Sequence, residues 1–176
     1  TMAPERFGKV LMLDPVSPLG LQMNSSQVGV ITAMKTDPDV CFAGLASAAP
    51  TLFRPETMVA GQMPQFADAT SPAQRELFKK IVERTRVLSD GIWFGTPHNL
   101  GLEWDSGALA KRMPEMTHEH LILFGKMDYW IPREHLDVMA AQLPNAKLEI
   151  FPYVGHSMNI EQPLLFARVF GDFLRA

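Results

Sequence analysis

The sequence has little of what marks secreted, membrane-spanning or nucleic-acid-binding proteins. Its 176 residues include a single cysteine, Cys41, which excludes an internal disulfide and fits a reducing compartment, so we expect a cytoplasmic protein. The longest apolar stretches are no longer than a strand, and no segment is expected to span a membrane. The net charge of −3 comes without a basic run, which argues against nucleic acid as a partner. Residues 1–6 lack the apolar core of a secretory signal.

What the sequence does contain is enough apolar residues for one globular domain, since 47% of them are hydrophobic. Three short apolar runs, at 9–13, 120–125 and 148–151, predict strands buried on both faces, as in a parallel sheet. Helices are predicted over 132–143, from apolar residues at helical spacing, and over 163–174. The end of the chain therefore predicts a strand–helix–strand–helix unit of the α/β class. The stripe expected to be buried on the final helix consists of Leu165, Phe166, Val169, Phe170 and Phe173.

Residues 17–117 differ from this pattern and predict a helical insertion between the first strand and the other two. Proline, glycine and methionine are frequent there, and three helices are predicted, at 37–47, 71–89 and 106–113. Ser71 and Gln74 form a capping box at the start of the second helix, and Gly91 is expected to end it. The residues of that helix expected to face a core are Leu77, Phe78, Ile81, Val82 and Leu88.

The first strand, at 9–13, makes a poor edge for a free-standing sheet. It has no polar face, so an exposed edge there would offer an apolar template for aggregation. We therefore expect further strands, from residues outside this sequence, to pair with it.

Two of the strands run into turns that each carry one residue able to move protons. Asp128 follows the run at 121–125, and His156 follows the run at 148–151 within Gly155-His156-Ser157. An aspartate that orients a histidine, with the histidine as general base, is the acid–base part of a nucleophile–His–Asp triad. The nucleophile elbow Gly-x-Ser-x-Gly that would complete such a triad occurs nowhere in the sequence.

The order of these motifs resembles the C-terminal portion of an α/β-hydrolase with a helical cap. Val10-Leu11-Met12-Leu13-Asp14-Pro15 is similar to the sixth strand of that family, and Gly125-x-x-Asp128-x-x-x-Pro132 to the turn that carries the acid. Gly155-His156-Ser157 and Glu161-x-Pro163 are similar to the histidine loop and the start of the final helix. The resemblance implies the C-terminal half of a doubly wound, mostly parallel sheet. It places residues 1–16 and 118–176 in that core and 17–117 in an inserted helical cap.

The resemblance also implies an activity and a partner. It implies hydrolysis of an ester, lactone or amide through a covalent acyl intermediate, with Asp128 and His156 as catalytic residues and neither metal nor organic cofactor. The nucleophile, a serine, and the oxyanion hole would come from a separate N-terminal chain of a processed precursor. The family also includes haloalkane, epoxide and carbon–carbon bond hydrolases, which this half of the fold does not exclude.

A small, largely apolar acyl substrate is expected from the composition of the cap. Methionine and aromatic side chains adapt to bulky apolar ligands, and no lysine or arginine cluster indicates a site for an anion. Most of these side chains are expected in the cap core and a few in the pocket: Met34, Phe42, Phe53, Met58, Met63, Phe66, Phe78, Trp93, Phe94, Trp104 and Met113.

Two residues leave alternatives open. Asp14 also ends a strand and is a rival for the acid, although Asp-Pro is a common strand terminator. Thr1 opens the chain, and an N-terminal threonine can cut its preceding peptide bond and act as a nucleophile with its own amine as base. That would make a self-processing threonine hydrolase, but it would leave Asp128 and His156 unexplained. The remaining alternative is a hydrolase-like binding protein that has lost its nucleophile.

Other chemically capable residues are interpreted as structural. His118 and His120 form a His-x-His pair without a third metal ligand close in sequence. Cys41 is expected in the core of the cap, and Glu103 and Asp105 as solvated charges.

Overall fold

Three parallel strands form the sheet in the computed structural model, which describes residues 6–176. The strands β1 (Lys9–Leu13), β2 (Glu119–Gly125) and β3 (Ala146–Phe151) lie side by side in that order. Leu11 is in register with Leu121, and Ile122 with Leu148. The three predicted strands are confirmed, each within two residues of its predicted limits.

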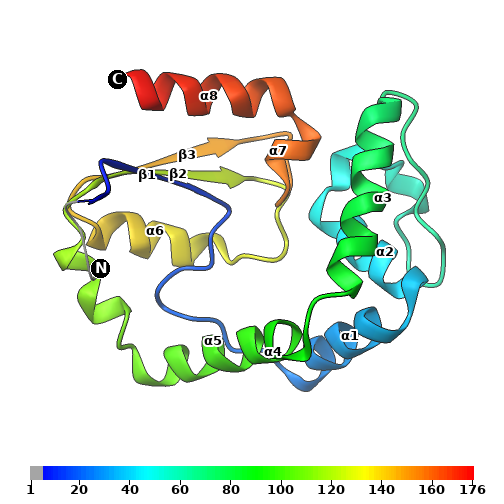
Figure 1. The fold of residues 1–176 in the computed structure, drawn as a ribbon, viewed down its shortest axis with the longest axis horizontal. Helices are drawn as coiled ribbons and strands as arrows, with labels where there is room; N and C mark the ends of the chain where they lie inside the picture. The colour runs from blue at the N-terminus through cyan, green and yellow to red at the C-terminus, as the bar shows by residue number, and fades with distance from the viewer. Residues whose placement is uncertain (1–5) are drawn as a thin grey trace.

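Helices α6 (Arg133–Gln142) and α8 (Pro163–Arg175) cover opposite faces of this sheet (Figure 1). Alternate side chains of β2 face the two helices: Ile122 and Phe124 pack with α6, while Leu121 and Leu123 pack with α8. Because β2 is buried on both faces, its sequence is a continuous apolar run rather than an alternating one. The chain therefore has a three-layer α/β architecture, as predicted.

The two outer strands are less buried than β2. Every residue of β1 is half-buried, and β1 pairs with β2 alone among the described residues. Its other edge is the one at which further strands were predicted to pair, and that stays a prediction.

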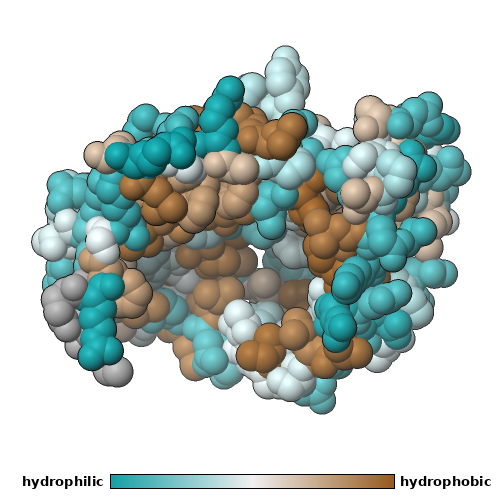
Figure 2. Space-filling view, turned by 45° about the horizontal axis from the view of Figure 1, so that its top comes forward, coloured by the Kyte–Doolittle hydropathy of each residue, from teal (hydrophilic) through white to brown (hydrophobic). Residues whose placement is uncertain are grey.

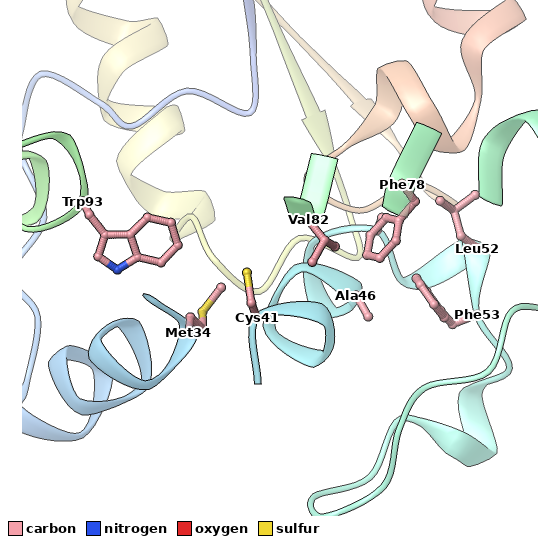
Figure 3. Packing of buried hydrophobic residues seen from close by; sticks show 9 residues of the cluster. Met34, Cys41, Ala46, Leu52, Phe53, Phe78, Val82 and Trp93 are labelled. Atoms are coloured by element: carbon pink, nitrogen blue, oxygen red, sulfur yellow. The ribbon is translucent and has the colours of Figure 1, made fainter. Parts of the chain in front are cut away.

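Five α-helices and three 3-10 turns lie between β1 and β2. They are α1 (Ser25–Thr36), α2 (Pro38–Ala48), α3 (Pro72–Arg86), α4 (Asp90–Trp93), α5 (Gly95–Ser106), η2 (Pro50–Leu52), η3 (Pro55–Thr57) and η4 (Ala110–Glu115). Helices α1 to α3 share a core of their own, in which Phe53 and Phe78 point toward each other with ring centroids 5.0 Å apart (Figure 3). Figure 2 shows hydrophobic side chains gathered around a hollow between the sheet and these helices. The division into a core and a cap stays a proposal.

The predicted helices of this region are partly confirmed. The capping box of Ser71 and Gln74 opens α3 as expected, but the helix ends at Arg86 rather than near Gly91. Leu77 and Leu88 are exposed, so their prediction as core residues is wrong for this chain. On α8, Phe170 is likewise exposed. The other residues predicted to be buried on this helix pack in one hydrophobic cluster with β2: Leu165, Phe166, Val169 and Phe173.

One predicted helix is wrong and helix α1 was missed, each for a local reason. No single helix covers 106–113. Helix α5 ends at Ser106, and Gly107 follows it in the left-handed conformation, with a φ of 58°. The next residues form the 3-10 turn η4, because Pro114 is incompatible with a regular α-helix there. Helix α1 was missed because its β-branched residues and weak amphipathicity hide it. The spacing Asn24-x-x-Gln27 is the sequence signal that would have found it, because these two residues form a capping box with reciprocal hydrogen bonds at the start of the helix.

Among residues 6–176, none of the helices combines the length and the apolar composition needed to cross a bilayer.

Candidate active site

Asp128 and His156 meet at the carboxyl ends of β2 and β3. The carboxylate Oδ2 of Asp128 lies 2.9 Å from Nδ1 of the imidazole, and the aspartate side chain is fully buried. Its Oδ1 accepts the backbone N–H groups of Trp130, at 2.6 Å, and Ile131, at 3.3 Å. One oxygen of the carboxylate is therefore fixed by the backbone and the other faces the imidazole.

The two loops are held together because the backbone pairing continues beyond the strands. The N–H of Lys126 donates to Phe151 O at 2.8 Å, and that of Met127 donates to Val154 O at 2.9 Å. The backbone N–H of Asp128 donates to Gly125 O at 2.9 Å and so closes the turn that follows β2. These hydrogen bonds join backbone groups only, so they fix the distance between the two loops without any contribution from side chains.

Gly125 is required by the close approach of these loops. A Cβ at this position would lie 2.1 Å from Gly155 O and 2.5 Å from Val154 O, both backbone atoms that cannot move aside. We expect Gly125→Ala to destabilise the protein by about 1–3 kcal/mol or more, because it forces the two loops apart. Urea denaturation measures the difference. Gly101→Ala is the control, since a Cβ there meets nothing within 4 Å. Equal stability of the two variants would contradict the expected clash.

The electrostatics of the pair favour a histidine that is protonated more readily than usual. Burial lowers the pKa of His156 and is the largest single influence. The hydrogen bond and negative charge of Asp128 outweigh it, with help from the charges of Asp14 and Glu161, so that the pKa is raised overall. An ionised carboxylate only accepts, so Nδ1 carries the proton in the neutral ring and Nε2 is left with its lone pair. Nε2 is the atom that can act as a base.

Comparison with known proteins finds relatives that match almost the whole chain, although no family model matches. The chain is 23% identical over 97% of its length to 2-hydroxy-6-oxononadienedioate/2-hydroxy-6-oxononatrienedioate hydrolase of Comamonas testosteroni. It superposes on a serine hydrolase of Cycloclasticus zankles with a TM-score of 0.62, at 17% identity, over 98% of this chain and 56% of that one. For the 2-hydroxy-6-oxo-6-phenylhexa-2,4-dienoate hydrolase of Rhodococcus sp. strain RHA1 the TM-score is 0.60, at 19% identity, over 99% and 58%.

The chain has the fold of the C-terminal part of an α/β-hydrolase. It spans about half the length of the curated relatives it matches, 55% in the case of the Comamonas protein.

Asp14, the rival acid, follows β1 and has a φ of 40°. Its Oδ1 accepts the N–H of Gly125 at 2.8 Å, and it makes no hydrogen bond to His156. Burial raises its pKa to about 7, although the bond from Gly125 lowers it. Asp14 therefore holds the end of β2, while Asp128 is the carboxylate that contacts the imidazole.

Glu161 is a site residue whose role was not predicted from the sequence. Its buried carboxylate accepts the N–H groups of Gly155, at 2.8 Å, and Ser157, at 3.3 Å, on either side of the histidine. The other oxygen accepts the N–H of Thr51 at 3.1 Å and its hydroxyl at 2.6 Å. Burial raises the pKa of Glu161, while these hydrogen bonds lower it. The motif Glu161-x-Pro163 was the available signal, but sequence spacing does not show which groups a carboxylate accepts.

The remaining candidates lie away from this site. His118 and His120 have ring centroids 6.2 Å apart, burial lowers the pKa of His120, and residues 6–176 contain no group of three or more side chains placed to hold a metal ion. Cys41 is buried in the core of α1 to α3, where burial raises the pKa of its thiol and disfavours the nucleophilic thiolate. Thr1 lies outside the described residues.

The two acidic residues of α5 also lie apart from Asp128 and His156. Glu103 accepts the backbone N–H of Leu109, and Asp105 is exposed to solvent. Asp105 fits the solvated charge predicted from the sequence, whereas half-buried Glu103 does not, because it accepts a specific backbone hydrogen bond.

Proposed function

We propose that this chain supplies the base and the acid of a hydrolase of the α/β-hydrolase type. The observation that carries the proposal is the 2.9 Å contact between buried Asp128 and Nδ1 of His156 at the carboxyl edge of the sheet. That edge is where open α/β sheets bind their ligands. The relatives' names support it, since the curated proteins matched over 97% of the chain are called hydrolases.

The reaction we propose is acyl transfer to water. Nε2 of His156 takes the proton of the nucleophile as it attacks the acyl carbon and then gives that proton to the leaving group. Water later attacks the acyl intermediate and gives a proton to His156; the bond between the acyl group and the nucleophile then breaks, and His156 returns the proton to the nucleophile. Asp128 stabilises the imidazolium in both steps and is not itself protonated. Substrates of this type are esters, lactones and amides, and the apolar hollow of Figure 2 favours small, largely apolar ones.

A second candidate function is hydrolysis of a 2-hydroxy-6-oxo-dienoate. Two curated relatives matched over 97% of the chain, from Comamonas testosteroni and Burkholderia cepacia, are named as hydrolases of such compounds. Assaying a 2-hydroxy-6-oxo-dienoate beside a panel of p-nitrophenyl esters separates the two substrate classes.

The nucleophile and oxyanion hole belong, in this proposal, to residues outside the present sequence, which has no Gly-x-Ser-x-Gly. They would extend the sheet at the free edge of β1. The finer proposal is that they reside on a separate N-terminal chain of a processed precursor, with a serine as the nucleophile. No organic cofactor or metal takes part in the proposed reaction.

A fluorophosphonate probe tests the proposal on protein expressed from the complete gene. We expect covalent labelling of one serine that maps outside these 176 residues, and loss of labelling in His156→Ala. Intact mass of the denatured protein then shows whether that serine and a 19.6 kDa species are separate chains. Labelling at Thr1, abolished in Thr1→Ala, would support the threonine hydrolase instead. Absence of any label together with absence of ester hydrolysis would support the non-catalytic binding protein.

A further inference from the structure

The indole of Trp130 is stacked on the imidazole of His156. The ring centroids are 5.5 Å apart and the planes differ by 25°. The backbone N–H of the same residue donates to Asp128, so Trp130 touches both members of the pair. Trp130 is 39% exposed, so burial in a core does not by itself fix the position of the indole. A directed contact is needed to hold it over the imidazole.

Ser47, near the end of α2, provides that contact. Nε1 of Trp130 donates to the Ser47 hydroxyl oxygen at 2.9 Å, and this hydroxyl donates in turn to Gly44 O at 2.6 Å. The hydroxyl proton is thus used within α2, and an oxygen lone pair is left to accept the indole N–H. A continuous series of contacts runs from α2 through Ser47 and Trp130 to the imidazole.

The segment that follows Ser47 is tied to the histidine loop. Pro50 lies so close to Gly155 that a Cβ on the glycine would come within 2.3 Å of the proline ring. Thr51 donates both its N–H and its hydroxyl to Glu161, whose other oxygen holds the N–H of Gly155. Segment 47–51 and the histidine loop are therefore joined at two further points. This fixes where Ser47 can place the indole.

We propose that Trp130 is a positioning residue for His156, held over the imidazole by Ser47. Stacking restricts rotation of the imidazole, and the electron-rich face of an indole attracts the imidazolium. The helical insertion thereby acts on the orientation of the base without touching the reacting atoms. The importance of this role for turnover rests on the proposed function, whereas the contacts themselves do not.

Three charged groups act on the imidazole, one from the same loop as Trp130 and two from elsewhere in the chain. They are Asp128 after β2, Asp14 after β1 and Glu161 of α7 (Met158–Glu161). Changes to the indole or to Ser47 leave these carboxylates in place. A shift in the titration of His156 in such variants therefore reports the loss of the stacked ring.

The test is a titration of His156 by NMR, with 13C-labelled histidine in the full-length protein. Trp130→Leu removes the aromatic face, and we expect the pKa of His156 to fall by about half a pH unit, the order expected for a partly exposed cation–π contact. Trp104→Leu is the matched control. Trp104 stacks on His135 with centroids 5.4 Å apart and planes at 28°, so this variant removes an equivalent stacked indole elsewhere and should leave the titration of His156 unchanged.

A double-mutant cycle tests the part assigned to Ser47. Trp130→Phe and Ser47→Ala both remove the hydrogen bond and keep an aromatic ring, and we expect each to lower kcat for a p-nitrophenyl ester by about 3- to 10-fold. Combining them should cost no more than either alone, because they break the same contact. Independent, multiplying effects would overturn the role of Ser47, and an unchanged titration of His156 in Trp130→Leu would overturn the role of the indole. The titration requires no turnover. Full activity in His156→Ala would therefore contradict the proposed function and would leave the proposed contact between Trp130 and His156 to be decided by the titration.

Discussion

His156→Ala is expected to lower kcat/KM by about 10^4- to 10^6-fold in the complete protein, the range measured when the base of a triad is removed. The variant loses the only atom of this chain, Nε2, that the proposed mechanism uses to move a proton. Substrate binding does not depend on that atom, so KM should change far less than kcat. Steady-state kinetics with a p-nitrophenyl ester measure both. His98→Ala, at an exposed position of α5, is the control and should retain activity.

The same variant should remain folded, with a cost that depends on pH. The pKa of His156 is raised in the folded protein above its ordinary value of 6.5. Its stabilising contribution is therefore fully present below pH 6.5 and is lost as the pH rises through the folded-state pKa. Removal of the ring should cost about 1–3 kcal/mol at pH 6, since it leaves the Asp128 carboxylate without its partner, and less at pH 9. Full activity, or a stability loss that grows with pH, would contradict this account of the pair.

The fold was predictable where local pattern and tertiary environment agree. The apolar run of β2 is continuous because β2, at the centre of the sheet, contacts α6 on one face and α8 on the other. Exposure of Leu77 and Phe170 was not predictable, because periodicity identifies an apolar helix face but not whether this chain covers it. The insertion was harder still, since its 3-10 turns and the β-branched α1 obey no simple period.

The sequence was enough to name the residues of the candidate site but not to predict which groups they contact. Asp128 and His156 stand out because each follows a strand, and parallel strands bring their carboxyl ends to one edge. The choice between Asp14 and Asp128 needed the geometry, in which one carboxylate accepts from Gly125 and the other faces the imidazole. Trp130 shows the same limit, because its partner Ser47 lies 83 residues away in the sequence.

Asp128→Asn is expected to lower kcat by about 10^3- to 10^4-fold while leaving the fold intact. The reason lies in the two backbone donors. The N–H groups of Trp130 and Ile131 both point at Oδ1, so they hold the carbonyl oxygen of the asparagine at that position. The amide NH2 must then face His156. It forces Nδ1 to accept, which places the proton on Nε2, and a protonated Nε2 cannot take a proton from a nucleophile.

The pH dependence of Asp128→Asn provides a second, independent signature. Without the carboxylate, the lowering effect of burial on His156 is opposed only by the charges of Asp14 and Glu161, and the pKa of the imidazole falls. The acidic limb of the kcat/KM profile should move to lower pH although the maximum rate is far smaller. Asp14→Asn is the matched comparison, because asparagine tolerates the positive φ and can still accept from Gly125. If Asp14→Asn lost more activity than Asp128→Asn, the acid of the pair would be Asp14. The contact between Asp128 and the imidazole would then serve only to hold the loop.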